Sequence, residues 1–227
     1  MAIIENAWRR ILEDCRAKHV TLIAVSKTKP VEDILAMYAL GQRDFGENYV
    51  QELVAKQPLL PEDIRWHFIG HLQSNKAKSI APFVHMIHGV DSFKLLQEIN
   101  KQGARYSRKI NCLLQVHVAL EETKFGLDET ELKSLLENFT SADEMEFVRI
   151  CGLMAMASFT ENQETIRNEF RRVKQLFESF HDHYFYHDDQ FREMSMGMSS
   201  DYKIALEEGS TMIRIGSLIF GERKTNN

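Results

Sequence analysis

The chain has 227 residues, of which 44% are hydrophobic and 27% are charged, a composition typical of a globular protein with one substantial core. Its formal net charge of −5 argues against broad attraction to phosphate backbones or anionic lipid, so we expect neither nucleic acid nor a membrane as a partner. The three cysteines lie far apart, and no apolar stretch suits a secretory signal or a membrane span, so we expect one cytoplasmic domain over residues 1–227.

Strand-like apolar runs alternate with amphipathic stretches along the whole chain. After an opening helix at residues 2–18, the pattern predicts strands at residues 21–26, 44–46, 65–69, 84–88, 110–118, 146–152, 192–195 and 212–215. The intervening helices are expected at residues 31–40, 49–56, from Ser74 onwards, and at 93–102, 129–138, 163–180 and 200–208. Eight such strands predict an α/β fold, a single-domain (β/α)8 TIM barrel with an extra N-terminal helix.

Polar and glycine-containing segments follow the carboxyl ends of the predicted strands. In a (β/α)8 barrel these ends share one rim, where active sites are built. The pattern therefore predicts a small-molecule site built from residues 26–29, 46–48, 70–76, 124–126, 198–200 and 214–217.

Lys27 lies at the end of the first predicted strand, where its amine would enter a partly dry barrel mouth. Desolvation lowers the pKa of an amine and favours the nucleophilic form that condenses with aldehydes. The alternative is a solvated charge on the rim. Lys29, next to Pro30, is expected at the surface.

The last predicted strand ends in a candidate phosphate site. Gly216 lets backbone approach a ligand closely, and Ser217 offers an N–H and a hydroxyl. Ser199 and Ser200 would add donors after the seventh strand, where phosphate sites of such barrels commonly lie. Alternatively, Ser199 caps a helix and Gly216 serves a turn.

The histidines do not predict a metal site. His67 and His71 lie near a strand end, where single histidines are more often structural, and His85, His88 and His117 fall in apolar strands. His181, His183 and His187 lack the spacing of a zinc hydrolase. We assign no metal.

Several motifs, in order along the chain, resemble those of the pyridoxal phosphate homeostasis protein family. They are the residues of segments 24–30, 45–52, 66–76, 152–156, 195–199 and 214–221. The resemblance implies a barrel similar to the alanine racemase N-terminal domain, with pyridoxal 5′-phosphate (PLP) bound in its mouth.

The resemblance also implies roles for individual residues. Lys27 would form the Schiff base, and Arg214 would lie beside the pyridine nitrogen. The phosphate would contact Ser199, Ser200, Gly216 and Ser217, and Asn48, His67 and Met154 would surround the ring. Lys124 matches a family lysine near the site, and we assign it no role.

Two considerations favour a carrier over a catalyst. An arginine keeps the pyridine nitrogen unprotonated, which makes the ring a poorer electron sink. Racemisation also needs a second proton donor, which alanine racemase takes from a further domain that we expect this chain to lack. The hypothesis is a protein, expected to be a monomer, that buffers PLP and delivers it to apo-enzymes; the alternatives are a small PLP-dependent amino-acid racemase and a barrel that binds a phosphate ligand without a covalent bond.

Overall fold

A computed structural model describes residues 3–119, 125–142 and 144–222 and contains a closed barrel of eight parallel strands. The strands are β1 (Thr21–Val25), β2 (Asp44–Glu47), β3 (Arg65–Phe68), β4 (Met86–Val90), β5 (Ile110–Gln115), β6 (Val148–Met154), β7 (Glu193–Ser195) and β8 (Met212–Ile215). Each strand pairs with the next along the chain, and the pairing of β1 with β8 closes the ring. The predicted (β/α)8 barrel is confirmed.

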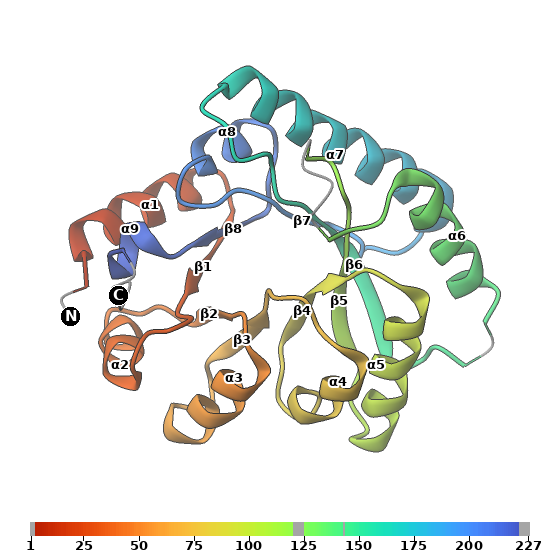
Figure 1. Ribbon diagram of the computed structural model, residues 1–227, viewed down its shortest axis with the longest axis horizontal. Helices are drawn as coiled ribbons and strands as arrows, with labels where there is room; N and C mark the ends of the chain where they lie inside the picture. The colour runs from red at the N-terminus through yellow and green to blue at the C-terminus, as the bar shows by residue number, and fades with distance from the viewer. Residues whose placement is uncertain (1–2, 120–124, 143, 223–227) are drawn as a thin grey trace.

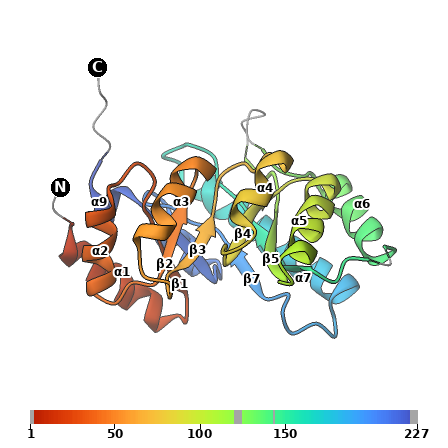
Figure 2. The same ribbon diagram turned by 90° about the horizontal axis from the view of Figure 1, so that it is seen from below.

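Helices cover the outside of the ring of strands (Figure 1). They are α1 (Glu5–Ala17), α2 (Val31–Ala39), α3 (Val50–Lys56), the 3-10 helix η1 (Gln57–Leu59), α4 (Ser74–Ile80), α5 (Phe93–Arg105), α6 (Glu129–Thr140), α7 (Gln163–Tyr184), α8 (Tyr202–Glu207) and α9 (Ser217–Phe220). The first and last helices lie side by side (Figures 1 and 2), and the Ile4 N–H donates to the Ile219 carbonyl at 2.8 Å. In the described part of the chain, no helix has the length and apolar character needed to cross a membrane.

Local sequence explains where several helices begin. At the start of α6, Asp128 accepts from the Glu131 N–H while the Glu131 side chain accepts from the Asp128 N–H, a reciprocal capping box. Ser92 caps α5 and Asn162 caps α7 with their side-chain oxygens. These caps satisfy N–H groups that have no partner within the helix.

Several predicted boundaries differ from the structure, most of them by one to three residues. Strand β4 begins two residues later than predicted and β5 ends at Gln115, because the chain beyond it turns toward Leu127. Helix α7 extends four residues further, to Tyr184. Helices η1 and α9 were not predicted, since each is too short to show helical periodicity.

Strand alternation divides the buried side chains into two layers. Ile23, Met86, Leu113, Cys151, Met154 and Met212 come from five strands around the ring and pack together, so they fill the barrel lumen. Leu22 and Ala24 alternate with Ile23 and pack in the larger cluster between strands and helices. Continued past the end of β1, this alternation places Ser26 outward and Lys27 inward, over the lumen.

Candidate functional site

The segment that carries Lys27 is fixed by a buried ionic cluster, here called the Lys56 clamp, consisting of Ser26, Glu47, Glu52 and Lys56. The Lys56 ammonium donates to the Ser26 carbonyl at 2.9 Å, to Glu47 Oε1 at 2.8 Å and to Glu52 Oε1 at 2.6 Å. The Ser26 hydroxyl donates to Glu47 at 2.7 Å, and the Thr28 N–H donates to Glu52 at 2.6 Å. Both sides of Lys27 are therefore anchored, while Lys27 itself is half-buried.

The backbone after Lys27 turns sharply. Thr28 has a φ of 65°, a left-handed conformation that is unfavourable for a β-branched residue. The expected surface position of Lys29 is wrong. Its side chain is buried because the amine donates to the Phe220 and Gly221 carbonyls at 2.8 and 3.2 Å, at the end of α9.

The proposed phosphate residues lie just after β8, at the start of α9, and in the loop after β7. A Cβ added to Gly216 would lie 3.5 Å from Val25 Cβ, so β1 and β8 are close neighbours at the rim. The Gly216 N–H donates to Ser199 Oγ at 3.3 Å, which joins the two loops. Ser200 and Ser217 are exposed. Ser199 does not cap α8, whose N-cap is Asp201.

Arg214 is a buried cation held by neutral acceptors. Its Nη1 donates to the Ser195 carbonyl at 2.7 Å and to Ser195 Oγ at 2.6 Å, and its Nη2 donates to the Ala155 carbonyl at 2.9 Å. Burial lowers the pKa of Arg214 to about 10, against the attraction of Asp201. Among the described residues, its Nε–H and one Nη2–H have no protein acceptor.

Of the other residues predicted to bind the cofactor, the structure brings some to the mouth of the barrel but not His67. Asn48 follows β2 directly and is half-buried, and Met154 ends β6 among the lumen side chains. His67 does not join them, because it lies within β3 and its ring bonds Asp44 and His88 inside the barrel. Lys124 lies outside the described residues.

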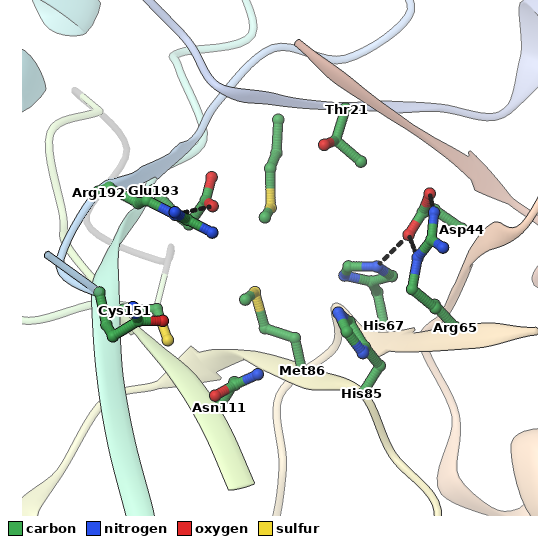
Figure 3. A pocket seen from close by; sticks show the side chains of 12 residues that line it. Thr21, Asp44, Arg65, His67, His85, Met86, Asn111, Cys151, Arg192 and Glu193 are labelled. Carbon is green, nitrogen blue, oxygen red and sulfur yellow. Dashed lines mark hydrogen bonds and ion pairs between the residues drawn. The ribbon is translucent and has the colours of Figure 1, made fainter. Parts of the chain in front are cut away.

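His67 instead lines a cavity at the opposite end of the barrel. This cavity of about 340 Å³ is bordered mainly by residues at the starts of strands, among them Thr21, Asp44, Arg65 and Met212. Figure 3 shows Asp44 and Arg65 beside His67 on one side of the cavity, and Arg192 with Glu193 across from them. Burial opposes ionisation of Asp44, but hydrogen bonds from His67 and Arg65 outweigh it and lower its pKa to about 2.

The histidines of this region predict a pH-dependent stability. Burial is the main cause that lowers the pKa of His85 from 6.5 to about 4. A lowered histidine pKa means that the unfolded chain binds more protons, so stability is lost as pH falls from about 6.5 toward about 4. We expect wild type to lose roughly 1 kcal/mol more than His85→Gln between pH 7.5 and pH 5, allowing for solvent screening of this partly exposed ring. Urea unfolding at both pH values measures this difference, and equal losses in the two proteins would contradict it.

A second cavity opens beside the serines of the rim. It has a volume of about 440 Å³ and is lined mainly by apolar side chains, including Met156, Phe159, Ile166 and Met198, with Ser200 at its edge. No group of three or more His, Cys, Asp or Glu side chains within the described ranges is arranged to hold a metal ion.

The supporting residues of the site were missed at the level of sequence. Glu47 and Lys56 occur in a predicted strand-end loop and a helix, where charged residues are usually solvated. Their burial follows from the outward alternation of β1 and β2, which places Ser26 and Glu47 under α3. That alternation is visible in the sequence once strand ends are known.

Comparisons with known proteins agree with this geometry. The family model described as "Alanine racemase, N-terminal domain" matches residues 1–224. A curated relative from Aquifex aeolicus, named "Pyridoxal phosphate homeostasis protein", is 40% identical over 204 residues, which cover 89% of this chain and 87% of the relative. The chain belongs to the pyridoxal phosphate homeostasis protein family.

Solved structures support both the family and the fold. PipY of Synechococcus elongatus PCC7942, whose structure is described as having PLP bound, is 36% identical with a TM-score of 0.82, and the match covers 95% of this chain and 99% of PipY. Alanine racemase of Bartonella henselae is 18% identical with a TM-score of 0.66, and the match covers 96% of this chain and 61% of the racemase. The second match shows a shared barrel fold only. The family resemblance predicted from the motifs is confirmed.

Proposed function

We propose that this member of the pyridoxal phosphate homeostasis protein family binds PLP through a Schiff base on Lys27, holds it, and delivers it to apo-enzymes within the cytoplasm. The observation that carries the proposal is the alternation of β1 beside β8: continued past Val25 it directs Lys27 inward, next to the segment that contains Arg214 and Gly216. The PLP-bound state described for PipY supports the choice of cofactor. When bound, PLP supplies an aldehyde that condenses with an amine.

The donors of the rim suit the two polar ends of this cofactor. Ser199, Ser200 and Ser217 offer hydroxyl and N–H donors to a phosphate, and Gly216, whose N–H joins the two segments through Ser199 Oγ, lets the ligand approach the backbone closely. The Nε–H and second Nη2–H of Arg214, which no described residue accepts, suit an acceptor such as a pyridine nitrogen. Asn48 and Met154 would border the ring.

Arg214 also argues for holding the cofactor over catalysis. A guanidinium that donates to the pyridine nitrogen keeps this nitrogen unprotonated, because two cations at hydrogen-bond distance repel. An unprotonated ring withdraws electrons less well, so carbanion chemistry is weakened. We accordingly propose that the protein is a carrier, and a monomer.

Trapping with borohydride tests the attachment. PLP is added to the purified protein, the imine is reduced, and the modified peptide is identified by mass spectrometry. We expect labelling at Lys27, its loss in Lys27→Ala, and retention in Lys133→Ala, a control that removes an exposed lysine of α6. Labelling that persists unchanged in Lys27→Ala would contradict the proposal.

Delivery is tested separately from attachment. We expect an apo-enzyme to acquire PLP from the loaded protein faster than PLP is released spontaneously. Transfer no faster than release would contradict delivery. Incubation with L-alanine in deuterated water tests the racemase alternative. Exchange of the α-proton and inversion at the α-carbon that depend on Lys27 would show that the protein is an enzyme and would contradict the carrier proposal.

A further inference from the structure

A continuous chain of buried hydrogen bonds crosses the barrel lumen from the mouth to the opposite end. Arg214 Nη1 lies 2.6 Å from Ser195 Oγ, which lies 2.9 Å from His88 Nδ1. His88 Nε2 lies 2.9 Å from His67 Nδ1, and His67 Nε2 lies 3.1 Å from Asp44 Oδ1. We call these five residues the barrel relay; all of them are buried, with exposed fractions of 8% or less.

The two ends of the barrel relay favour one direction for every bond in it. A guanidinium can only donate, so Ser195 Oγ accepts from Arg214 and its own proton is available to His88 Nδ1. His88 is then protonated at Nε2 and donates to His67 Nδ1. His67 is in turn protonated at Nε2 and donates to Asp44, whose carboxylate can only accept.

The reverse direction leaves a buried hydroxyl without a partner. If His67 carried both protons, it would donate to His88 Nε2, and His88 would donate from Nδ1 to Ser195. Ser195 Oγ would then accept from both His88 and Arg214, and within the barrel relay its proton would have no acceptor. A buried unpaired donor is costly, which favours two neutral histidines. The environment of His88 agrees, because burial, together with the positive charge of Arg214, holds its pKa well below 6.5.

This direction has a consequence for Arg214. The barrel relay commits the Ser195 proton to His88, so the Ser195 oxygen remains an acceptor for Nη1. With Nη1 and one side of Nη2 fixed on the wall, the remaining N–H groups of Arg214 are held in one orientation. Asp44, the carboxylate at the end of the barrel relay, lies at the other end of the barrel. There it pairs with Arg65 and lines the cavity of Figure 3.

We propose that Asp44, His67, His88 and Ser195 are positioning residues that orient Arg214 toward the mouth, so that removal of the Asp44 carboxylate as the terminal acceptor alters the group facing the cofactor. The part that concerns the cofactor rests on the proposed function; the coupling of Asp44 to Arg214 does not.

Nitrogen-15 NMR of the full-length, cofactor-free protein tests the direction of the bonds. Long-range correlations distinguish protonated from unprotonated ring nitrogens, and His67→Gln and His88→Gln assign the two rings. We expect both rings to carry a proton on Nε2 alone at neutral pH. A proton on Nδ1 of either ring would overturn the proposal.

Substitution of Asp44 tests the coupling. Asp44→Asn keeps the shape but lets the terminal group donate, so we expect the ring resonances and the Arg214 guanidinium resonances to shift. The matched control is Arg65→Gln, which removes the ion pair with Asp44 but leaves the carboxylate to accept from His67. Should Asp44→Asn fail to fold, Ser195→Ala interrupts the barrel relay between His88 and Arg214, and we expect the same resonances to shift. Guanidinium resonances that stay unchanged in these variants would overturn the coupling.

Titration with PLP extends the test to the cofactor. We expect Asp44→Asn to bind PLP roughly three- to tenfold more weakly, as one misdirected hydrogen bond implies, and Arg65→Gln to bind as wild type does. Equal affinity in Asp44→Asn and wild type would overturn the role toward the cofactor. If borohydride fails to label Lys27 in the unaltered protein, the proposed function fails, whereas the NMR experiments still decide the barrel relay.

Discussion

Replacing Lys56 with methionine is expected to destabilise the protein by about 3–5 kcal/mol, as for other buried ion pairs that lose one partner. The Lys56 side chain is 9% exposed and that of Glu47 is fully buried, so the carboxylate left behind has no access to water. Glu47 Oε2 already has no hydrogen-bond partner among the residues that the structure describes, and the substitution removes the ammonium from Oε1. We therefore expect most of the lost stability to come from the buried Glu47 carboxylate, and less from Glu52, whose side chain is partly exposed.

The loss should depend on pH in a defined direction. Burial raises the pKa of Glu47 above 4.5, while Lys56 acts to lower it, so the variant has a still higher value. A raised carboxyl pKa means that the folded protein binds the extra proton, and stability is then regained as pH falls through the folded pKa. We expect the difference between Lys56→Met and wild type in urea unfolding to be smaller at pH 5 than at pH 7.5.

A double variant is the control for this explanation. Glu47→Gln combined with Lys56→Met removes both charges, so it should recover much of the stability that Lys56→Met loses. The double variant should still bind PLP less well, because the Ser26 carbonyl and the Glu52 carboxylate lose the ammonium that joins them beside Lys27. A double variant as unstable as the single one would show that Lys56 acts through packing alone.

Alternation and strand count were sufficient to predict the barrel and its rim. Even the short strands β2 and β7, of four and three residues, pair with neighbours on both sides and close the ring. The inward position of Lys27 follows from the same alternation, since Thr21 and Ile23 lie on the inner side of β1. Local pattern therefore predicted the architecture, while the position of the proposed amine stays a prediction from that pattern.

Contacts between distant residues could not be predicted in this way. Lys29 resembled a surface lysine because its acceptors, the carbonyls of Phe220 and Gly221, are 191 and 192 residues away. The family motif placed His67 near the cofactor in the mouth. A motif gives the position of a residue along the sequence but not the direction of its side chain, which here contacts Asp44 and His88. Ser195 and His88 are 107 residues apart, and no periodicity relates them.

Substituting Gly152 with alanine should lower the free energy of unfolding by roughly 3 kcal/mol or more, because it adds a steric overlap to backbone strain. Gly152 has a φ of +146°, and a Cβ there would overlap the Glu193 carbonyl oxygen on β7. That oxygen is backbone, so relief requires β7 to move away from β6. The movement would reach the site, because β7 ends at Ser195, whose carbonyl and hydroxyl both accept from Arg214.

Gly41→Ala separates strain from overlap. Gly41 has a φ of +103° with nothing within 4 Å of an added Cβ, so its substitution should cost only about 1–2 kcal/mol. Urea unfolding of both variants gives the comparison, and PLP titration shows whether the excess loss at Gly152 extends to the mouth. Equal stability of the two variants would mean that β7 moves away from the added methyl group without a free-energy cost. The inference that β7 holds Ser195 rigidly against Arg214 would then be wrong.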